Sequence, residues 1–152
     1  MSKLSRSKGR KLDFTRFWNV WERILEENRE GTILIVEGKN DMKVLRTLYV
    51  NGKIVLSRNH DFWTTISLVQ NSKRVLVLTD FDEEGEKEAR KLSNMLRNMG
   101  LYVLDNLRRE LKAVLGPVQR IEDLSHFIDD LIDNAPFKFV KEGLVSKGII
   151  HH

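Results

Sequence analysis

The chain has 152 residues, of which 41% are hydrophobic and 32% are charged, so it has room for one globular domain with a substantial core. It has no cysteine, which excludes disulfide bonds and thiolate metal sites, and no apolar run of about 18 residues that could span a membrane. The beginning of the chain lacks the apolar stretch of a secretory signal, so we expect a cytoplasmic protein.

The net charge of +4 is concentrated at the N-terminus. Residues 1–12 contain no acidic side chain, and their basic residues are Lys3, Arg6, Lys8, Arg10 and Lys11. We expect this segment to be a flexible basic tail in which Lys8, Arg10 and Lys11 bind nucleic-acid phosphates. The alternative is a solvated chain end that has no partner.

The first predicted elements are a helix and a buried strand. Apolar residues at helical spacing follow Asp13 and predict a helix to about Asn28, within an N-terminal helical segment at 13–30. Residues 32–36 are continuously apolar. Continuous rather than alternating hydrophobicity is typical of a strand that is covered on both faces, as in a parallel sheet.

Strands and helices continue to alternate along the chain. We predict further strands at 53–57, 75–78 and 101–104, and helices after Asp41, at 63–70 and at 85–99. This alternation predicts an α/β fold with a doubly wound, mainly parallel four-stranded sheet flanked by helices. Two more helices, at 106–115 and 121–133, would complete a domain spanning 31–135. Residues 136–152 form a C-terminal extension, for which a short strand and a turn is one interpretation.

Acidic side chains follow two of the predicted strands. Glu37 comes directly after the first strand and Asp80 closely follows the third, so both are expected at the edge of the sheet where parallel strands present ligands. Residues 80–86 contain five carboxylates, which repel one another unless a cation neutralises them. Oxygen ligands without Cys or a neighbouring His favour Mg²⁺ or Mn²⁺, and such an ion suits phosphoryl chemistry. A simpler alternative is that the acids after Asp82 only form the acidic first turn of a helix.

Two motifs, in order and each at the end of a predicted strand, resemble those of the Toprim family. Residues 34–41 (LIVEGKND) are similar to the first motif, an apolar strand that ends in Glu-Gly, and residues 77–86 (VLTDFDEEGE) are similar to the second, Asp-x-Asp after a strand. The second motif resembles most closely the Thr-Asp-x-Asp-x-Glu-Gly-Glu run of type IA topoisomerases. The first resembles that of the bacterial ribonucleases that mature 5S ribosomal RNA, and of small archaeal Toprim proteins. The resemblance covers residues 32 to about 105 and implies a Toprim, Rossmann-like sheet.

The resemblance also implies a role for each matching acid. Glu37 would be the general acid/base that moves a proton at the attacking or departing oxygen. Asp80 and Asp82 would hold the metal ion, and Glu84 occupies the third acidic position of the topoisomerase-like motif. The implied cofactor is Mg²⁺ or Mn²⁺.

Residues around the two motifs are open to two interpretations. Gly38 and Gly85 would let the backbone approach a phosphate closely, and Asp41 is expected to cap its helix rather than to bind metal. Lys39 and Arg58 follow the first two strands and could bind nucleic-acid phosphates, although each could equally be a solvated surface residue.

Other polar residues receive no role in this hypothesis. We expect Arg108, Arg109 and Lys112 to be solvated, and we assign no metal-binding role to His60 or His126. Topoisomerases use a tyrosine nucleophile on a separate domain, whereas Tyr49 and Tyr102 fall within apolar patterns and are predicted to belong to the core. Strand passage by this chain is therefore not expected.

Two functions of different kinds remain. The first is a metal-dependent nuclease acting on RNA or DNA, resembling an endoribonuclease, with Glu37 as its general acid/base. The second is a Toprim module that binds nucleic acid without cleaving it, as a subunit of a larger processing assembly with a protein partner. Nucleotidyl transfer of the primase kind ranks below both.

Overall fold

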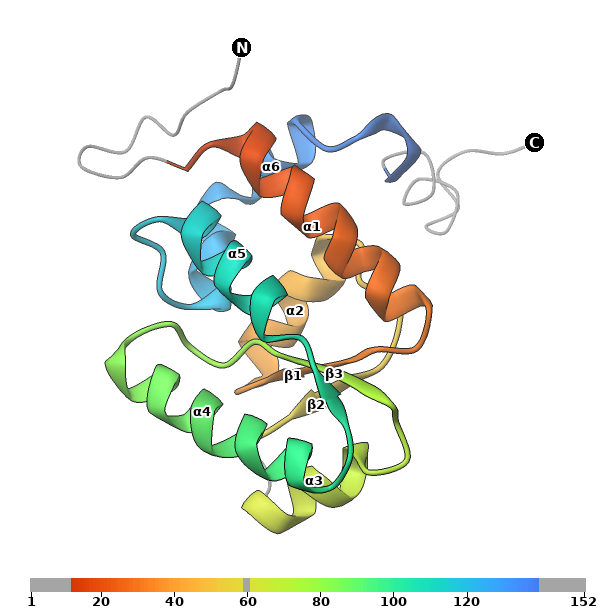
Figure 1. The fold of residues 1–152 in the computed structure, drawn as a ribbon. Helices are drawn as coiled ribbons and strands as arrows, with labels where there is room; N and C mark the ends of the chain where they lie inside the picture. Colours follow the sequence, from red (N-terminus) through yellow and green to blue (C-terminus); the bar gives the residue numbers. More distant parts are fainter. Residues whose placement is uncertain (1–11, 59–60, 140–152) are drawn as a thin grey trace.

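A four-stranded parallel sheet forms the centre of the structure, a computed structural model in which residues 12–58 and 61–139 are described (Figure 1). Its strands are β1 (Ile33–Val36), β2 (Ile54–Leu56), β3 (Arg74–Val77) and β4 (Tyr102–Val103). They lie in the order β2-β1-β3-β4, and each connection runs through a helix, as parallel pairing requires. The carboxyl ends of the two central strands, β1 and β3, therefore lie side by side.

The central strands are buried on both faces. Ile33 pairs with Val75, and Leu34 pairs with Leu76. Because successive side chains of a strand point to opposite faces, Leu34 and Leu76 join one core cluster while Ile33 and Val75 join the other. This arrangement confirms the expectation drawn from the continuous apolar runs in the sequence.

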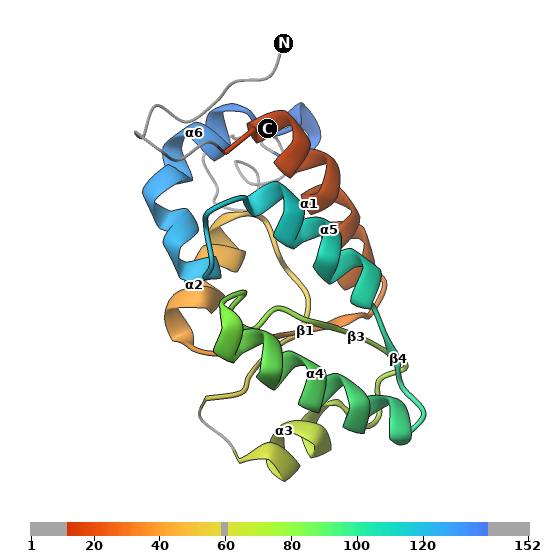
Figure 2. The same cartoon turned by 60° about the vertical axis from the view of Figure 1, so that its left-hand side comes forward.

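Helices cover both faces of the sheet, as Figures 1 and 2 show from two directions. One face carries α3 (Phe62–Val69) and α4 (Glu83–Asn98). On the other side lie α1 (Phe14–Arg29), α2 (Lys39–Thr47), α5 (Asp105–Leu115), the 3-10 helix η1 (Ile121–Phe127) and α6 (Ile128–Asp133). The predicted doubly wound α/β architecture is therefore confirmed.

Helix α1 supplies much of the aromatic core. Asp13 caps its first turn. The indole N–H of Trp18 donates to the carbonyl of Leu131 (2.8 Å), and that of Trp21 donates to the carbonyl of Leu48 (2.9 Å). Since each indole N–H keeps a hydrogen-bond partner, both tryptophans can be buried without leaving a polar group unsatisfied.

The structure differs from the sequence prediction in three places. The helix predicted at 121–133 is divided into η1 and α6. Tyr102 was predicted in the core, but it is 60% exposed because β4 lies at the edge of the sheet, and its ring lies 4.7 Å from the guanidinium of Arg74. Tyr49, by contrast, packs against the core. Residues 137–139, within the proposed strand and turn, are helical, and the rest of that extension lies outside the described residues.

Among the helices of the described residues, none is long and apolar enough to cross a lipid bilayer.

Candidate functional site

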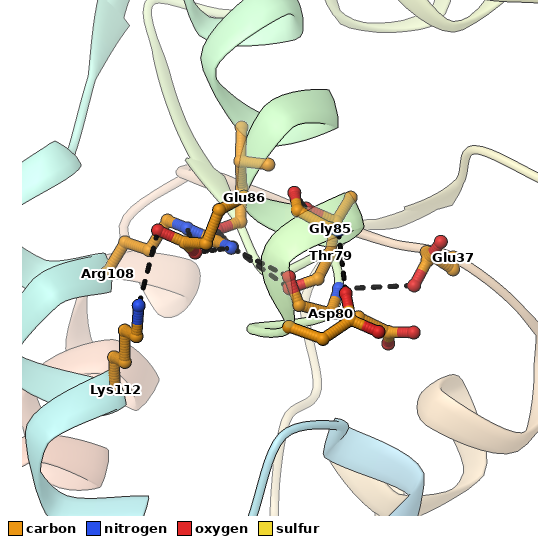
Figure 3. Close-up of polar contacts among 9 residues, drawn as sticks. Glu37, Thr79, Asp80, Gly85, Glu86, Arg108 and Lys112 are labelled. Carbon is orange, nitrogen blue, oxygen red and sulfur yellow. Dashed lines mark hydrogen bonds and ion pairs between the residues drawn. The ribbon is translucent and has the colours of Figure 1, made fainter.

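The ends of β2, β1 and β3 bring Arg58, Glu37 and Asp80 together. Because β1 lies between β2 and β3, Glu37 lies between the other two residues. The backbone N–H of Arg58 donates to the carbonyl of Glu37 (2.8 Å). The backbone N–H of Asp80 donates to Oε2 of the Glu37 carboxylate (3.1 Å), a contact that Figure 3 shows. The two acids that follow predicted strands thus share one edge of the sheet.

Asp80 lies in a strongly negative environment. Its side chain is half-buried, with Glu37, Asp41 and Asp82 as acidic neighbours. Burial, then hydrogen bonding to and repulsion from Glu37, and then repulsion from Asp41 and Asp82, raise the pKa of Asp80 to about 8. The ionised form of this carboxyl group is therefore destabilised in the absence of a nearby cation.

Helix α4 is packed tightly against the loop that carries Asp80. Oδ1 of Asp82 accepts a hydrogen bond from the backbone N–H of Gly85 (2.7 Å) and so caps the helix. A Cβ atom at residue 85 would lie 2.1 Å from the carbonyl oxygen of Asp80. The absence of a side chain at Gly85 is thus explained by this packing, whereas the sequence interpretation attributed it to a bound phosphate.

Glu88 also lies among these acidic residues, although the sequence analysis assigned it no role. Burial, then repulsion from and hydrogen bonding to Glu37, and then repulsion from Glu84 and Asp82, raise the pKa of Glu88. Glu84 is exposed one helical turn before Glu88. Their i,i+4 spacing is the pattern in the sequence that could have placed both on one face of α4. We call Glu37, Asp80, Asp82, Glu84 and Glu88 the acidic cluster.

Arg108 corrects another expectation, because it is only 6% exposed rather than solvated. Its Nη1 donates to the carbonyls of Val77 (2.9 Å) and Thr79 (3.0 Å). Its Nη2 donates to the carbonyl of Asp80 (2.9 Å), and its Nε donates to Oε1 of Glu86 (3.1 Å). Figure 3 shows Arg108 on one side of Asp80 and Glu37 on the other. Arg108 therefore fixes the backbone at the end of β3 without belonging to either motif.

Asp41 connects the first motif with η1. Its buried carboxylate accepts hydrogen bonds from the backbone N–H of Gly38 (3.1 Å) and from that of Glu122 (2.9 Å). The first contact confirms that Asp41 caps α2, as the sequence predicted. The second motif has a similar connection, because the N–H of Phe81 donates to the carbonyl of Gln119 (2.7 Å). Both motif loops are thus attached to the segment that follows α5.

The donor atoms of the acidic cluster fit a hard divalent cation. They are all carboxylate oxygens, which Mg²⁺ and Mn²⁺ prefer, and a cation would relieve the repulsion that raises the pKa of Asp80 and of Glu88. Within residues 12–58 and 61–139, no group of three or more His, Cys, Asp or Glu side chains is arranged to hold a metal ion. Mg²⁺ is commonly held by only one or two carboxylates with water completing its shell, and Asp80 and Asp82 are enough for that.

A cavity of about 390 Å³ opens beside Glu37, and Arg58 and Glu88 also line it. A larger hollow of about 820 Å³ lies between α1, β4 and α5, and no member of the acidic cluster is among its described lining residues. Several of its charged side chains form ion pairs, such as that of Arg74 with Glu27 (3.1 Å). The smaller cavity is therefore the one that belongs to the acidic cluster.

The predicted phosphate-binding residues are only partly brought to this site. Arg58 is exposed and lines the cavity together with Glu37. Lys39 is exposed at the start of α2 and is not among the described residues that line the cavity. Lys8, Arg10 and Lys11 lie outside the described residues.

Comparisons with known proteins extend the motif resemblance. The family model of the Toprim domain matches residues 32–113. The chain is 38% identical over 110 residues to a UPF0292 protein of Pyrococcus furiosus, a match that covers 70% of this chain and 82% of that protein. It is 39% identical over 115 residues to a UPF0292 protein of Thermococcus onnurineus, covering 74% and 83%. A solved structure from Aquifex aeolicus has a TM-score of 0.61 and 26% sequence identity, covering 69% of this chain and 94% of that one.

Proposed function

The chain belongs to the Toprim domain family, whose domains generally bind a metal ion and act on nucleic acids, and we propose that it is a Mg²⁺- or Mn²⁺-dependent nuclease. Its substrate would be a phosphodiester bond of RNA or DNA. RNA is the first substrate to test, because the first motif resembles that of ribonucleases that mature ribosomal RNA.

The observation that carries this proposal is the position of Glu37. Its carboxylate is held by the backbone N–H of Asp80 at the edge of the sheet, beside the other members of the acidic cluster. A carboxylate held there can accept a proton from an attacking water or donate one to the departing oxygen. Binding alone needs no general acid/base, so this placement of Glu37 favours cleavage.

The neighbouring residues would complete the site. Asp80 and Asp82 would hold the metal ion, which when bound supplies charge stabilisation and a more acidic water. Lys39 and Arg58 would bind phosphates of the strand. The basic residues of the tail, Lys8, Arg10 and Lys11, would add attraction that does not depend on sequence.

The Glu37→Gln variant tests the general acid/base. Gln keeps the shape of the side chain and can still accept from the Asp80 N–H, but it cannot transfer the proton. We expect cleavage to fall by ~10²–10⁴-fold while metal affinity stays close to that of the wild type. The measurements are cleavage of labelled single- and double-stranded RNA and DNA with Mg²⁺ or Mn²⁺, and calorimetric titration of the metal.

Glu26→Gln is the matched control, because Glu26 is exposed on α1 and outside the acidic cluster. It should cleave as the wild type does. If wild type cleaves none of the substrates with either metal, the isolated chain is not a nuclease. The binding module, or a subunit that needs a partner protein, would then replace this proposal.

A further inference from the structure

Two aromatic residues begin the helix that borders the cavity beside Glu37. Phe62 lines this cavity, and Trp63 follows it at the start of α3. The rings of Phe62 and Trp63 form an edge-to-face pair with centroids 6.4 Å apart. Phe62 and Glu37 thus both line the cavity, whereas Trp63 contacts the Phe62 ring without being among the described lining residues.

Trp63 is unusually accessible for a tryptophan. It is 66% exposed, whereas Trp18 and Trp21, in α1, are 3% and 0% exposed. A large aromatic side chain gains most when it is covered, and its flat face can cover another flat ring. Trp63 is therefore available to stack on a ligand, and its ring contacts that of Phe62, which lines the same cavity as Glu37.

Positive charge accompanies the aromatic pair. The Nζ of Lys91, on α4, lies 5.2 Å from the ring centroid of Phe62, and Lys91 also lines the cavity. Arg58 also lines the cavity. Its guanidinium lies close to Gly38, where an added Cβ would be 3.3 Å from Nη1. A ligand with a flat ring and an anionic group would match this combination of aromatic rings and cations.

We propose that this cavity binds one unpaired nucleotide, with its base stacked on the Phe62–Trp63 pair and its phosphate near Arg58 and Lys91. The volume of about 390 Å³ lies at the small end of the usual range for ligand sites, which suits one nucleotide rather than a base pair. A base inside a duplex is already stacked on both sides, so a single-stranded segment offers a base to these rings at a lower energetic cost. This inference rests on the proposed function and specifies its substrate as single-stranded nucleic acid.

Binding measurements on matched variants test the inference. Labelled oligouridylate and oligothymidylate of about eight nucleotides, and duplexes of the same length, are titrated against protein carrying Glu37→Gln so that cleavage during the titration is minimal. In this background Trp63→Ala should bind single strands roughly 5- to 150-fold more weakly, the usual effect of losing one base–aromatic stack. Trp63→Phe should recover most of the affinity, because it retains a ring.

Phe137→Ala is the control, because Phe137 is 78% exposed and follows α6, away from the cavity. It should bind as the unsubstituted background does, and both variants should keep the unfolding midpoint unchanged because each removes an exposed side chain. Stacking should also quench Trp63 fluorescence, which the two buried tryptophans cannot reproduce.

Three results would overturn the inference. These are equal affinity for single strands and duplexes, equal affinity of Trp63→Ala and Phe137→Ala, or no quenching on saturation with a single strand. If cleavage still depends on Glu37 in any of these cases, only the nucleotide cavity is wrong. If no nucleic acid binds to any variant, the proposed function fails with it.

Discussion

At the scale of single residues, Arg108 shows how the shape of the site depends on a side chain that performs no chemistry. Its N–H groups satisfy three backbone carbonyls from Val77 to Asp80 and the carboxylate of Glu86. A guanidinium has five donors in a fixed fork, which lysine cannot reproduce. The carboxylates of the second motif therefore keep their positions because a residue on α5 holds the backbone beneath them.

We predict that Arg108→Ala destabilises the fold by roughly 1–3 kcal/mol, the usual cost of leaving buried carbonyl groups without their donor. Arg108→Lys should recover only part of that stability, since it restores the charge but not the fork. Arg109→Ala is the matched control, because Arg109 is exposed on the same helix, and it should stay within about 0.5 kcal/mol of the wild type. Denaturation curves in urea would measure all three, and equal loss in Arg108→Ala and Arg109→Ala would contradict the structure.

For Gly85→Ala, the structure predicts a loss of stability where a glycine-to-alanine change in a helix normally gives a gain. An alanine that replaces glycine inside a helix normally stabilises it by about 0.5–1 kcal/mol. Here the added Cβ would lie 2.1 Å from the carbonyl oxygen of Asp80, so α4 must move away from the loop. We expect a net loss of roughly 1–3 kcal/mol, as for an overpacked core position. Thermal unfolding of Gly85→Ala would measure this loss, with Lys87→Ala, an exposed position on α4, as the control. If Gly85→Ala were more stable than the wild type, the loop that carries Asp80 would have moved to accommodate the added Cβ.

At the scale of elements, the segment after α5 controls how the two motif loops are held. Asp41 joins the start of α2 to η1, and the carbonyl of Gln119 accepts from the backbone of Phe81. Neither contact lies within the sheet. The two motif loops are consequently held at one end by β1 and β3, and they are also hydrogen-bonded to the segment that contains Gln119 and η1.

The Asp41→Asn variant should loosen this support. Both oxygens of the buried carboxylate accept backbone N–H groups, whereas an amide offers one oxygen and turns a donor toward the second N–H. We expect a loss of about 1–3 kcal/mol, the cost of an unsatisfied buried group, and faster hydrogen exchange at the backbone N–H of Glu122. Asp129→Asn, an exposed acid on α6, should change neither measurement. Unchanged exchange at Glu122 would show that Asp41 does not hold η1.

Elements were more predictable than contacts for a physical reason. Hydrophobic periodicity is local, so each strand of the sheet and most helices were predicted close to their observed bounds. Arg108 was predicted to be solvated because its partners are carbonyls about thirty residues earlier in the chain, and no side chain in the sequence marks a carbonyl as a partner. Tyr102 was misplaced because a short apolar run does not reveal that its strand lies at an edge.

Some residues of the candidate site could likewise be predicted from the sequence, and others could not. Glu37 and Asp80 could be found because each follows an apolar strand, and the order of parallel strands brings such positions together. Glu88 was missed because it belongs to a helix turn whose acids have a sufficient explanation in the helix dipole. Glu88 is itself exposed, and its closeness to Glu37, which only the fold creates, distinguishes it from the other acids of α4.

At the scale of the whole molecule, the proposed metal site predicts that stability depends on metal. We predict that Mg²⁺ at about 100 times its dissociation constant adds about 2.7 kcal/mol to the stability of the wild type, which corresponds to a rise in Tm of roughly 5–10 °C. Asp80→Asn should abolish that rise. In EDTA at neutral pH the same variant should be more stable than the wild type, because Asn removes a group that ionises freely in the unfolded chain but whose ionisation is disfavoured in the fold.

Glu83→Gln is the matched control for this metal prediction. Glu83 is exposed at the start of α4 and lies next to the proposed ligands without belonging to the acidic cluster. It should keep most of the rise in Tm. If Asp80→Asn is stabilised by Mg²⁺ as strongly as Glu83→Gln, the ion binds elsewhere on the molecule.

The hydrogen bonds of Arg108 have a consequence for the order in which metal and nucleic acid bind. Its guanidinium is occupied by carbonyls and Glu86, so the edge of the sheet around Asp80 and Glu37 keeps a negative field. A phosphodiester group that approaches Asp80 and Glu37 is repelled less once a cation has arrived, so we expect metal binding to precede productive binding of the scissile phosphate. Raising the nucleic-acid concentration would then not compensate for missing metal, and a chelator would stop turnover while leaving the protein folded.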